Sequence, residues 1–206
     1  MEENSRVRSE IVRSRTGLDS IVATGEQLVR DVVLHLTKQN LHMVQQDQIS
    51  ICMRECVTKV LDKHEILFNS FVSRLNGAEG ISEDVFLTIA NELFMEGGVT
   101  WSRIIALYAL AGRLAIYCHT NNRLMLNIGC KIPQSMVPCI TSKIAPFVRK
   151  NGGWIRLCEE FPIKEDMTNK IWLCLLVTGA GLGLAAVLLA KYMPVNSMPV
   201  TGRTLL

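Results

Sequence analysis

The segment Gly97–Cys118, GGVTWSRIIALYALAGRLAIYC, constrains the fold more than any other part of the chain. Two glycines followed by a threonine are typical of one helix ending and the next beginning. The run from Ile104 to Gly112 then carries no charge and almost no polar atom, and a helix that is apolar on all sides must be buried. Because the run is too short to cross a bilayer and Arg113 interrupts it, we expect the central helix of a helical bundle.

Arg103 occupies an unusual position in this helix. It lies in the first turn, where a cation faces the positive end of the helix dipole, and this placement is mildly unfavourable. The position therefore suggests an acidic partner for Arg103. An arginine whose charged end simply reaches solvent is the alternative that residue chemistry leaves open.

The rest of residues 21–165 also has helical spacing, so we expect one all-α bundle preceded by a flexible polar tail over residues 1–20. Thr24 and Gln27 have the spacing of a capping box and predict that the first helix begins there and ends near Gln39. The spacing from Ile51 to Leu75 predicts a second helix.

Three prolines complicate the helix that the apolar residues of 124–146 predict. Pro133, Pro138 and Pro146 each lack a backbone N–H, and a proline inside a helix removes a hydrogen bond and bends the chain. We therefore expect this helix to be bent or split. A further short helix is predicted over Trp154–Phe161.

The C-terminal region holds a second long apolar run, Ile171–Ala190, which has no charged residue. At about 1.5 Å per residue it spans roughly 30 Å, the thickness of the hydrocarbon core of a bilayer. Trp172 and Tyr192 lie near its ends, where aromatic rings favour the membrane interface. The pattern predicts a transmembrane tail anchor over 168–192, a short lumenal tail over 193–206 and a bundle facing the cytosol. A buried core helix is the alternative.

Composition and motifs argue against several classes of function. The net charge is +3, aromatic residues make up 6% and no dense Lys/Arg cluster occurs, so nucleic acid is not an expected partner. The run Gly181–Ala186 matches a dinucleotide-binding pattern, but it lacks the preceding strand and any later acidic residue. No nucleophile–base arrangement is evident, so we expect no enzyme, no catalytic residue and no cofactor. No metal ligands are expected among the histidines, which are His35, His42, His64 and His119.

The cysteines favour a reducing compartment. There are seven, an odd number, and none has the CxxC spacing. Reduced thiols are therefore favoured over a disulfide scaffold.

Two motifs resemble those of the Bcl-2 apoptosis regulators. Glu92–Phe94 followed by Gly98–Leu107, VTWSRIIA at its centre, resembles the first Bcl-2 homology motif of that family. Asn151-Gly152-Gly153-Trp154, preceded by Phe147–Lys150, resembles the second. The order and spacing of the two motifs and the apolar run after them also fit, so the resemblance covers most of residues 24–191.

The resemblance implies a bundle of about eight helices around a buried central helical hairpin. It also implies a surface groove that accepts an amphipathic helix, a mode of recognition for which this family is itself a known example. In the family, the arginine of the first motif pairs with an aspartate of the bound helix, and Arg103 holds that place here. Ser102 stands where the family has glycine. The groove residues so implied are Arg103, Ser102, Val99, Leu107, Phe94 and Phe68.

The family's third motif is matched by Val57–Ile66, VTKVLDKHEI. The matching positions are Val57, Val60, Leu61 and Asp62. Leu61 replaces a small residue, and His64 stands where an apolar residue is usual. The segment belongs to the second helix of the bundle, and its release for insertion into another molecule is left open.

The resemblance implies a regulator of mitochondrial apoptosis. Whether it promotes or prevents cell death has two interpretations. One is an effector similar to the Bok branch, which permeabilises the outer mitochondrial membrane. The other is a pro-survival guardian that sequesters pro-apoptotic helices in the same groove. Expected partners are amphipathic helices of other family members, a homo- or heterodimer through the groove, and lipids of the mitochondrial or endoplasmic-reticulum membrane. A generic tail-anchored helical protein with a chance match is the third interpretation.

Overall fold

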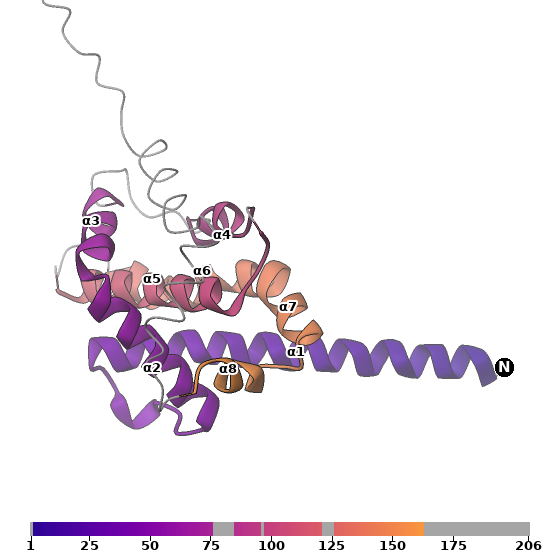
Figure 1. Cartoon of the computed structure of the whole chain (residues 1–206). Helices are drawn as coiled ribbons and strands as arrows, with labels where there is room; N and C mark the ends of the chain where they lie inside the picture. The colour runs from indigo at the N-terminus through magenta and orange to yellow at the C-terminus, as the bar shows by residue number, and fades with distance from the viewer. Residues whose placement is uncertain (1, 76–84, 96, 121–125, 163–206) are drawn as a thin grey trace, which may run out of the picture.

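The structure is a computed structural model, which describes residues 2–75, 85–95, 97–120 and 126–162 (Figure 1). Within these ranges every regular element is helical and no strand occurs, as the sequence predicts. None of the described helices is both long and apolar enough to cross a membrane. The predicted anchor over 168–192 and the tail over 193–206 lie outside the described residues. The elements are α1 (Glu2–Thr37), η1 (Leu41–Met43), α2 (Gln48–Lys63), α3 (Glu65–Leu75), α4 (Val85–Met95), α5 (Trp101–Thr120), α6 (Leu126–Cys139), the π-helical η2 (Ile140–Ile144), α7 (Ala145–Lys150) and α8 (Ile155–Glu160).

Helix α5 is the centre of the bundle, which confirms the prediction from its apolar sequence. Every residue from Trp101 to Gly112 is buried, and α5 packs against α1, α2 and α6. The predicted end of one helix and the beginning of the next are also present. The amide of Gly98 donates to the carbonyl of Phe94 at 3.1 Å to close α4, and Gly97 and Gly98 have φ of 90° and 75°. Thr100 Oγ1 then accepts from the amide of Arg103 at 3.3 Å at the start of α5.

The proline-containing segment after α5 is split, as predicted. Pro133 and Pro138 lie inside α6, and the chain then passes through the π-helical η2 before α7 begins. A proline cannot supply the amide that a regular helix needs, and a π-helical turn accommodates the change in register. In the part of α6 whose side chains are described, residues 131–139, Ile132 and Met136 face the core while Gln134 is exposed.

The prediction of a flexible tail over residues 1–20, with a helix start at Thr24, is wrong. Helix α1 already begins at Glu2, and both residues of the expected capping box lie inside it. Thr24 Oγ1 donates to the carbonyl of Ser20 at 2.9 Å, a bond within the helix. Residues 2–16 contain neither proline nor glycine, the two residue types that most disfavour a helix interior, so the helix continues through them.

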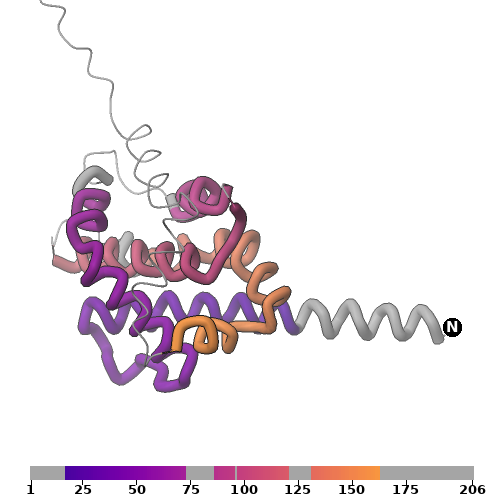
Figure 2. Tube along the Cα trace, in the orientation of Figure 1, coloured from indigo at the N-terminus to yellow at the C-terminus, as the bar shows by residue number. Residues whose placement is uncertain are grey.

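The predicted single helix over Ile51–Leu75 is two helices. Figure 2 shows the trace turning between α2 and α3, and His64, at φ −120° and ψ 30°, forms the joint. The polar His64 interrupts the apolar spacing that Val57 and Val60 establish in α2. The turn allows α3 to place Val72 in the core from a new direction.

Candidate helix-binding site

The junction between α4 and α5 encloses the side chain of Arg103. The residue is fully buried, and its Nη1 donates to the carbonyl oxygen of Gly98 at the start of the junction. A Cβ added to Gly97 would lie 3.5 Å from both terminal nitrogens of the guanidinium, so the backbone passes close to the charge. Burying a cation is costly unless hydrogen bonds satisfy it, and here the chain's own turn supplies one.

The other predicted groove residues belong to the core of the bundle or pack against it. Phe94 and Leu107 belong to one buried cluster, and Phe68 and Val99 pack against it while half-buried. Ser102 is also buried. The predicted residues therefore belong to the core of the bundle or pack against it, with most of their side chains covered. Three exposed apolar residues lie close to Phe68 or Phe94 in the sequence, namely Ile66, Leu67 and Met95. The groove itself stays a prediction.

The third-motif segment lies in α2 with its apolar face turned into the bundle. Val57, Val60 and Leu61 are buried, whereas Asp62 is exposed. Helix α2 packs against α1, α5 and α8. Insertion of this face into another molecule would therefore require α2 to leave those three helices.

The second motif ends α7 and turns the chain back toward the core. Asn151 Nδ2 donates to the carbonyl of Phe147 at 2.7 Å, and the amide of Gly153 donates to Val148 at 2.9 Å. Gly152 and Gly153 have φ of 85° and 88°, which residues with a side chain rarely adopt. This tight turn places Trp154 in the core at the start of α8.

Trp154 and Tyr108 fasten this part of the bundle to α1. The indole Nε1 of Trp154 donates to the carbonyl oxygen of Ile21 at 3.0 Å. The hydroxyl of Tyr108 donates to the carbonyl oxygen of Gly25 at 2.9 Å. Burial raises the pKa of Tyr108 well above its ordinary value. The ring of Trp101 lies edge-on to that of Phe147, with the centroids 5.1 Å apart, and tilted against that of Trp154, at 6.0 Å. Nothing in the sequence pattern indicated the bonds of Trp154 and Tyr108 to α1.

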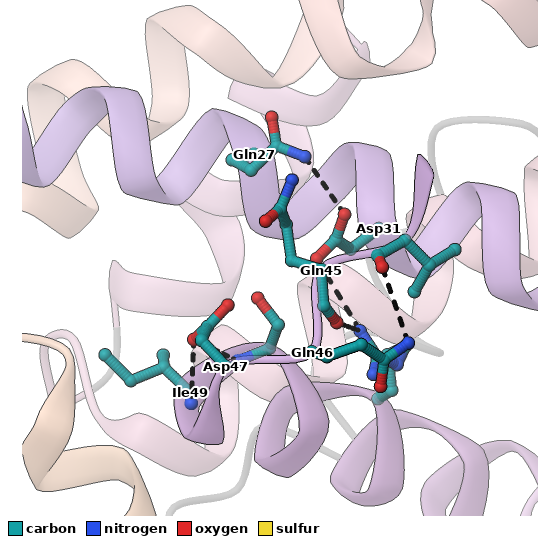
Figure 3. Close-up of polar contacts among 9 residues, drawn as sticks. Gln27, Asp31, Gln45, Gln46, Asp47 and Ile49 are labelled. Atoms are coloured by element: carbon teal, nitrogen blue, oxygen red, sulfur yellow. Dashed lines mark hydrogen bonds and ion pairs between the residues drawn. The ribbon is translucent and has the colours of Figure 1, made fainter. Parts of the chain in front are cut away.

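A buried ion pair joins α1 to α2, and sequence analysis missed it (Figure 3). Asp31 is fully buried, accepts from Gln27 Nε2 at 3.0 Å and lies 3.6 Å from Arg54 Nη1. The same nitrogen of Arg54 donates to the carbonyl of Gln45 at 2.8 Å. A signal was available, because Asp31 falls three residues after Leu28 on the apolar face of the first helix.

The described cysteines are thiols. Cys52, Cys56, Cys118 and Cys139 are buried and Cys158 is half-buried. Burial raises the pKa of Cys139 to about 12. Across the described ranges, no group of three or more His, Cys, Asp or Glu side chains is arranged to hold a metal ion.

The family model for the Bcl-2 apoptosis regulator proteins matches residues 53–154, which include both homology motifs. The chain belongs to the Bcl-2 family. Among curated relatives, Bcl-2-like protein 1 of Gallus gallus is 25% identical over 80% of this chain and 74% of the relative. Bcl-2-related ovarian killer protein homolog A of Danio rerio is 30% identical over 53% of each chain, so the match spans about half of that relative.

Solved structures support the same fold. The crystal structure of chicken BOK matches with a TM-score of 0.56 and 19% identity, covering 69% of this chain and 96% of the other. BCL-2 of Trichuris suis also matches with a TM-score of 0.56, at 22% identity, covering 76% of this chain and 96% of the other. The described bundle is therefore Bcl-2-like.

Proposed function

We propose that this apoptosis regulator is a Bok-like effector, which permeabilises the outer mitochondrial membrane after an amphipathic helix engages the α4–α5 region. Its partners are helices of other Bcl-2 family members, a second copy of the chain through the groove, and membrane lipids. Arg103, Ser102, Val99, Leu107, Phe94 and Phe68 line the groove that opens.

The burial of Arg103 is the observation that carries this proposal. Its guanidinium is bonded to Gly98 and covered by the α4–α5 junction, so a ligand aspartate reaches it only after the junction opens. A protein that exchanges a closed state for an open one responds to a ligand that binds the open state better. Such a switch suits an effector that is turned on by a helix. A guardian that captures helices needs a groove that stands open.

The effector also needs a membrane attachment. We assign this role to residues 168–192, whose uncharged apolar run, Ile171–Ala190, is flanked by Lys170 and Lys191. The bundle then faces the cytosol from the outer mitochondrial membrane or the endoplasmic reticulum. Residues 193–206 form the short lumenal tail.

A guardian is the second candidate, and two observations favour it. The match to chicken Bcl-2-like protein 1 covers more of the chain than the match to the zebrafish killer proteins. In addition, Asn151-Gly152-Gly153-Trp154 is the guardian-like form of the second motif. In this case, the same groove sequesters pro-apoptotic helices.

Dye release from liposomes separates the two candidates. The full chain is added to cardiolipin-containing liposomes with a trapped dye, with and without an apoptotic helix peptide. An effector releases dye, and the peptide increases the rate. If the chain releases nothing and instead blocks release by an added effector, it is a guardian. Liposomes without the chain give the background, and Arg156→Ala, a change at an exposed arginine of α8, serves as the control variant.

A further inference from the structure

Cys52 and Cys158, which are far apart in sequence, both lie where α2 packs against α8. Cys52 Sγ donates to the carbonyl oxygen of Phe161 at 3.5 Å, and Cys158 Sγ donates to that of Gln48 at 3.7 Å. Gln48 lies one turn before Cys52, and Phe161 lies one turn after Cys158. Both sulfur atoms therefore lie at the same crossing of α2 and α8, and the pKa of each thiol is shifted by the other.

The surroundings keep both thiols protonated while the bundle is closed. A hydrogen bond with the thiol of Cys56, together with burial, raises the pKa of Cys52 well above its ordinary value. Burial raises the pKa of Cys158 to about 12, and Cys52 adds to the rise. Since the thiolate is the reactive form, oxidation is slow at neutral pH and accelerates as pH rises. Cys158 is half-buried, so it is the thiol that a small molecule reaches first.

We propose that Cys52 and Cys158 form a reversible disulfide that locks α2 against α8. The oxidant is a small disulfide of the glutathione type. The thiolate of Cys158 attacks one sulfur of this disulfide, forms a mixed disulfide and releases one small thiol. The thiolate of Cys52 then attacks the sulfur of Cys158 and releases the second. Two protein thiols are oxidised, one small disulfide is reduced, and the two protons end on the two released thiols.

Cys56 is the competing partner for Cys52, and it would have a different effect. Cys52 and Cys56 are four residues apart on the same helix, so a bond between them constrains neither α2 nor its neighbours. A bond between Cys52 and Cys158 closes a loop across most of the bundle. Helix α2, which carries the third-motif residues Val57 and Leu61, then cannot leave without α8. The effect of this lock on membrane permeabilisation rests on the proposed function.

The full chain oxidised with glutathione disulfide tests the lock. Mass spectrometry of a non-reduced digest is expected to show the peptides of Cys52 and Cys158 joined with the loss of two hydrogens. The Tm is expected to rise by about 5–10 °C, and dithiothreitol reverses both changes. Between pH 7 and 9 the rate is expected to rise about tenfold per pH unit, because both pH values lie well below the pKa of Cys158.

Matched variants decide the assignment. Cys158→Ser and Cys158→Ala should abolish the linked peptide and the Tm rise, whereas Cys118→Ser, at a buried thiol of α5, should retain both. Separate glutathione adducts on Cys52 and Cys158 without a link would overturn the proposal, as would a Tm rise that persists in both Cys158 variants.

Dye release by the oxidised and the reduced chain distinguishes a failure of the disulfide lock from a failure of the proposed effector function. The oxidised chain is expected to release dye at least tenfold more slowly than the reduced chain. Equal rates would refute the locking of α2. If the reduced chain releases no dye at all, the proposed effector function fails, while the linked peptide still supports the disulfide.

Discussion

The indole nitrogen of Trp154 donates a hydrogen bond to the carbonyl oxygen of Ile21, 3.0 Å away and 133 residues earlier in the chain. One helical turn further along α1, the carbonyl of Gly25 accepts from the hydroxyl of Tyr108. The second homology motif and the central helix are therefore attached to consecutive turns of α1. A Cβ at Gly25 would lie 3.1 Å from the ring of Trp154, so a residue without a side chain permits this close contact.

Trp154→Phe should lower the free energy of unfolding by about 1–3 kcal/mol. The change removes one hydrogen bond, which contributes about 0.5–1.5 kcal/mol, and part of a buried ring. Tyr108→Phe is the matched variant, because it removes only a hydroxyl and should cost about 0.5–1.5 kcal/mol. Urea denaturation followed by circular dichroism measures both. A Trp154→Phe variant as stable as the wild type would contradict the attachment to α1.

Arg54→Met should be strongly destabilising, by about 3–5 kcal/mol, because it leaves the buried carboxylate of Asp31 without its cation. Replacing both partners, as Asp31→Leu with Arg54→Met, should recover most of the loss, since a buried pair often contributes little more than apolar residues of similar volume. The same denaturation measurement applies. A double variant no more stable than the single one would show that Arg54 acts through its bond to Gln45 instead.

Gly112 lies where α5 packs tightly against α1. A Cβ there would lie 2.4 Å from Leu36 Cδ1 and 3.1 Å from Val32 Cγ1. Gly112→Val should therefore lower the free energy of unfolding by about 1–3 kcal/mol through overpacking. Gly17→Ala is the control, because nothing lies within 4 Å of its added Cβ. That change should raise stability by up to about 1 kcal/mol. A Gly112→Val variant as stable as the wild type would mean that α1 moves aside at no cost.

Stability should decline in alkaline solution, and buried thiols predict the pH range. The pKa of Cys139 is raised to about 12 in the folded chain, against about 8.5 for an unperturbed thiol. Below the lower pKa the thiol is protonated in both the folded and the unfolded chain, so its contribution to the free energy of unfolding is fully present. It is lost between about pH 8.5 and 12, by up to about 1.4 kcal/mol per pH unit. Cys139→Ala should lessen this slope in a series of urea denaturations. A slope unchanged by the substitution would assign the decline to other groups.

Local patterns predicted the central part of the fold. The uniformly apolar run after Gly98 required a buried helix, and the threonine at position 100 marked its start correctly. The prolines after residue 130 correctly predicted a split helix, because a missing amide has the same local effect in any fold. These features depend on backbone chemistry within a few residues.

Features that depend on tertiary contacts were not predictable in the same way. The capping box at Thr24 was sterically and chemically reasonable, but helix α1 continues through it. The joint at His64 depends on how α2 and α3 each meet α5. For Arg103, the sequence indicated a cation in need of a partner. It did not indicate that the carbonyl of Gly98, five residues earlier, accepts from the guanidinium.

A double-mutant cycle between Arg103 and a ligand aspartate tests the central claim most directly. An amphipathic apoptotic helix peptide with its aspartate, and the same peptide with alanine there, are titrated against the wild-type chain and Arg103→Ala by fluorescence anisotropy. Arg156→Ala controls for loss of a positive charge elsewhere. We predict that each single change weakens binding by about 2–5 kcal/mol, and that the second change adds little once the first is made. Affinities for the aspartate peptide that are equal in the wild type and in Arg103→Ala would contradict the claim.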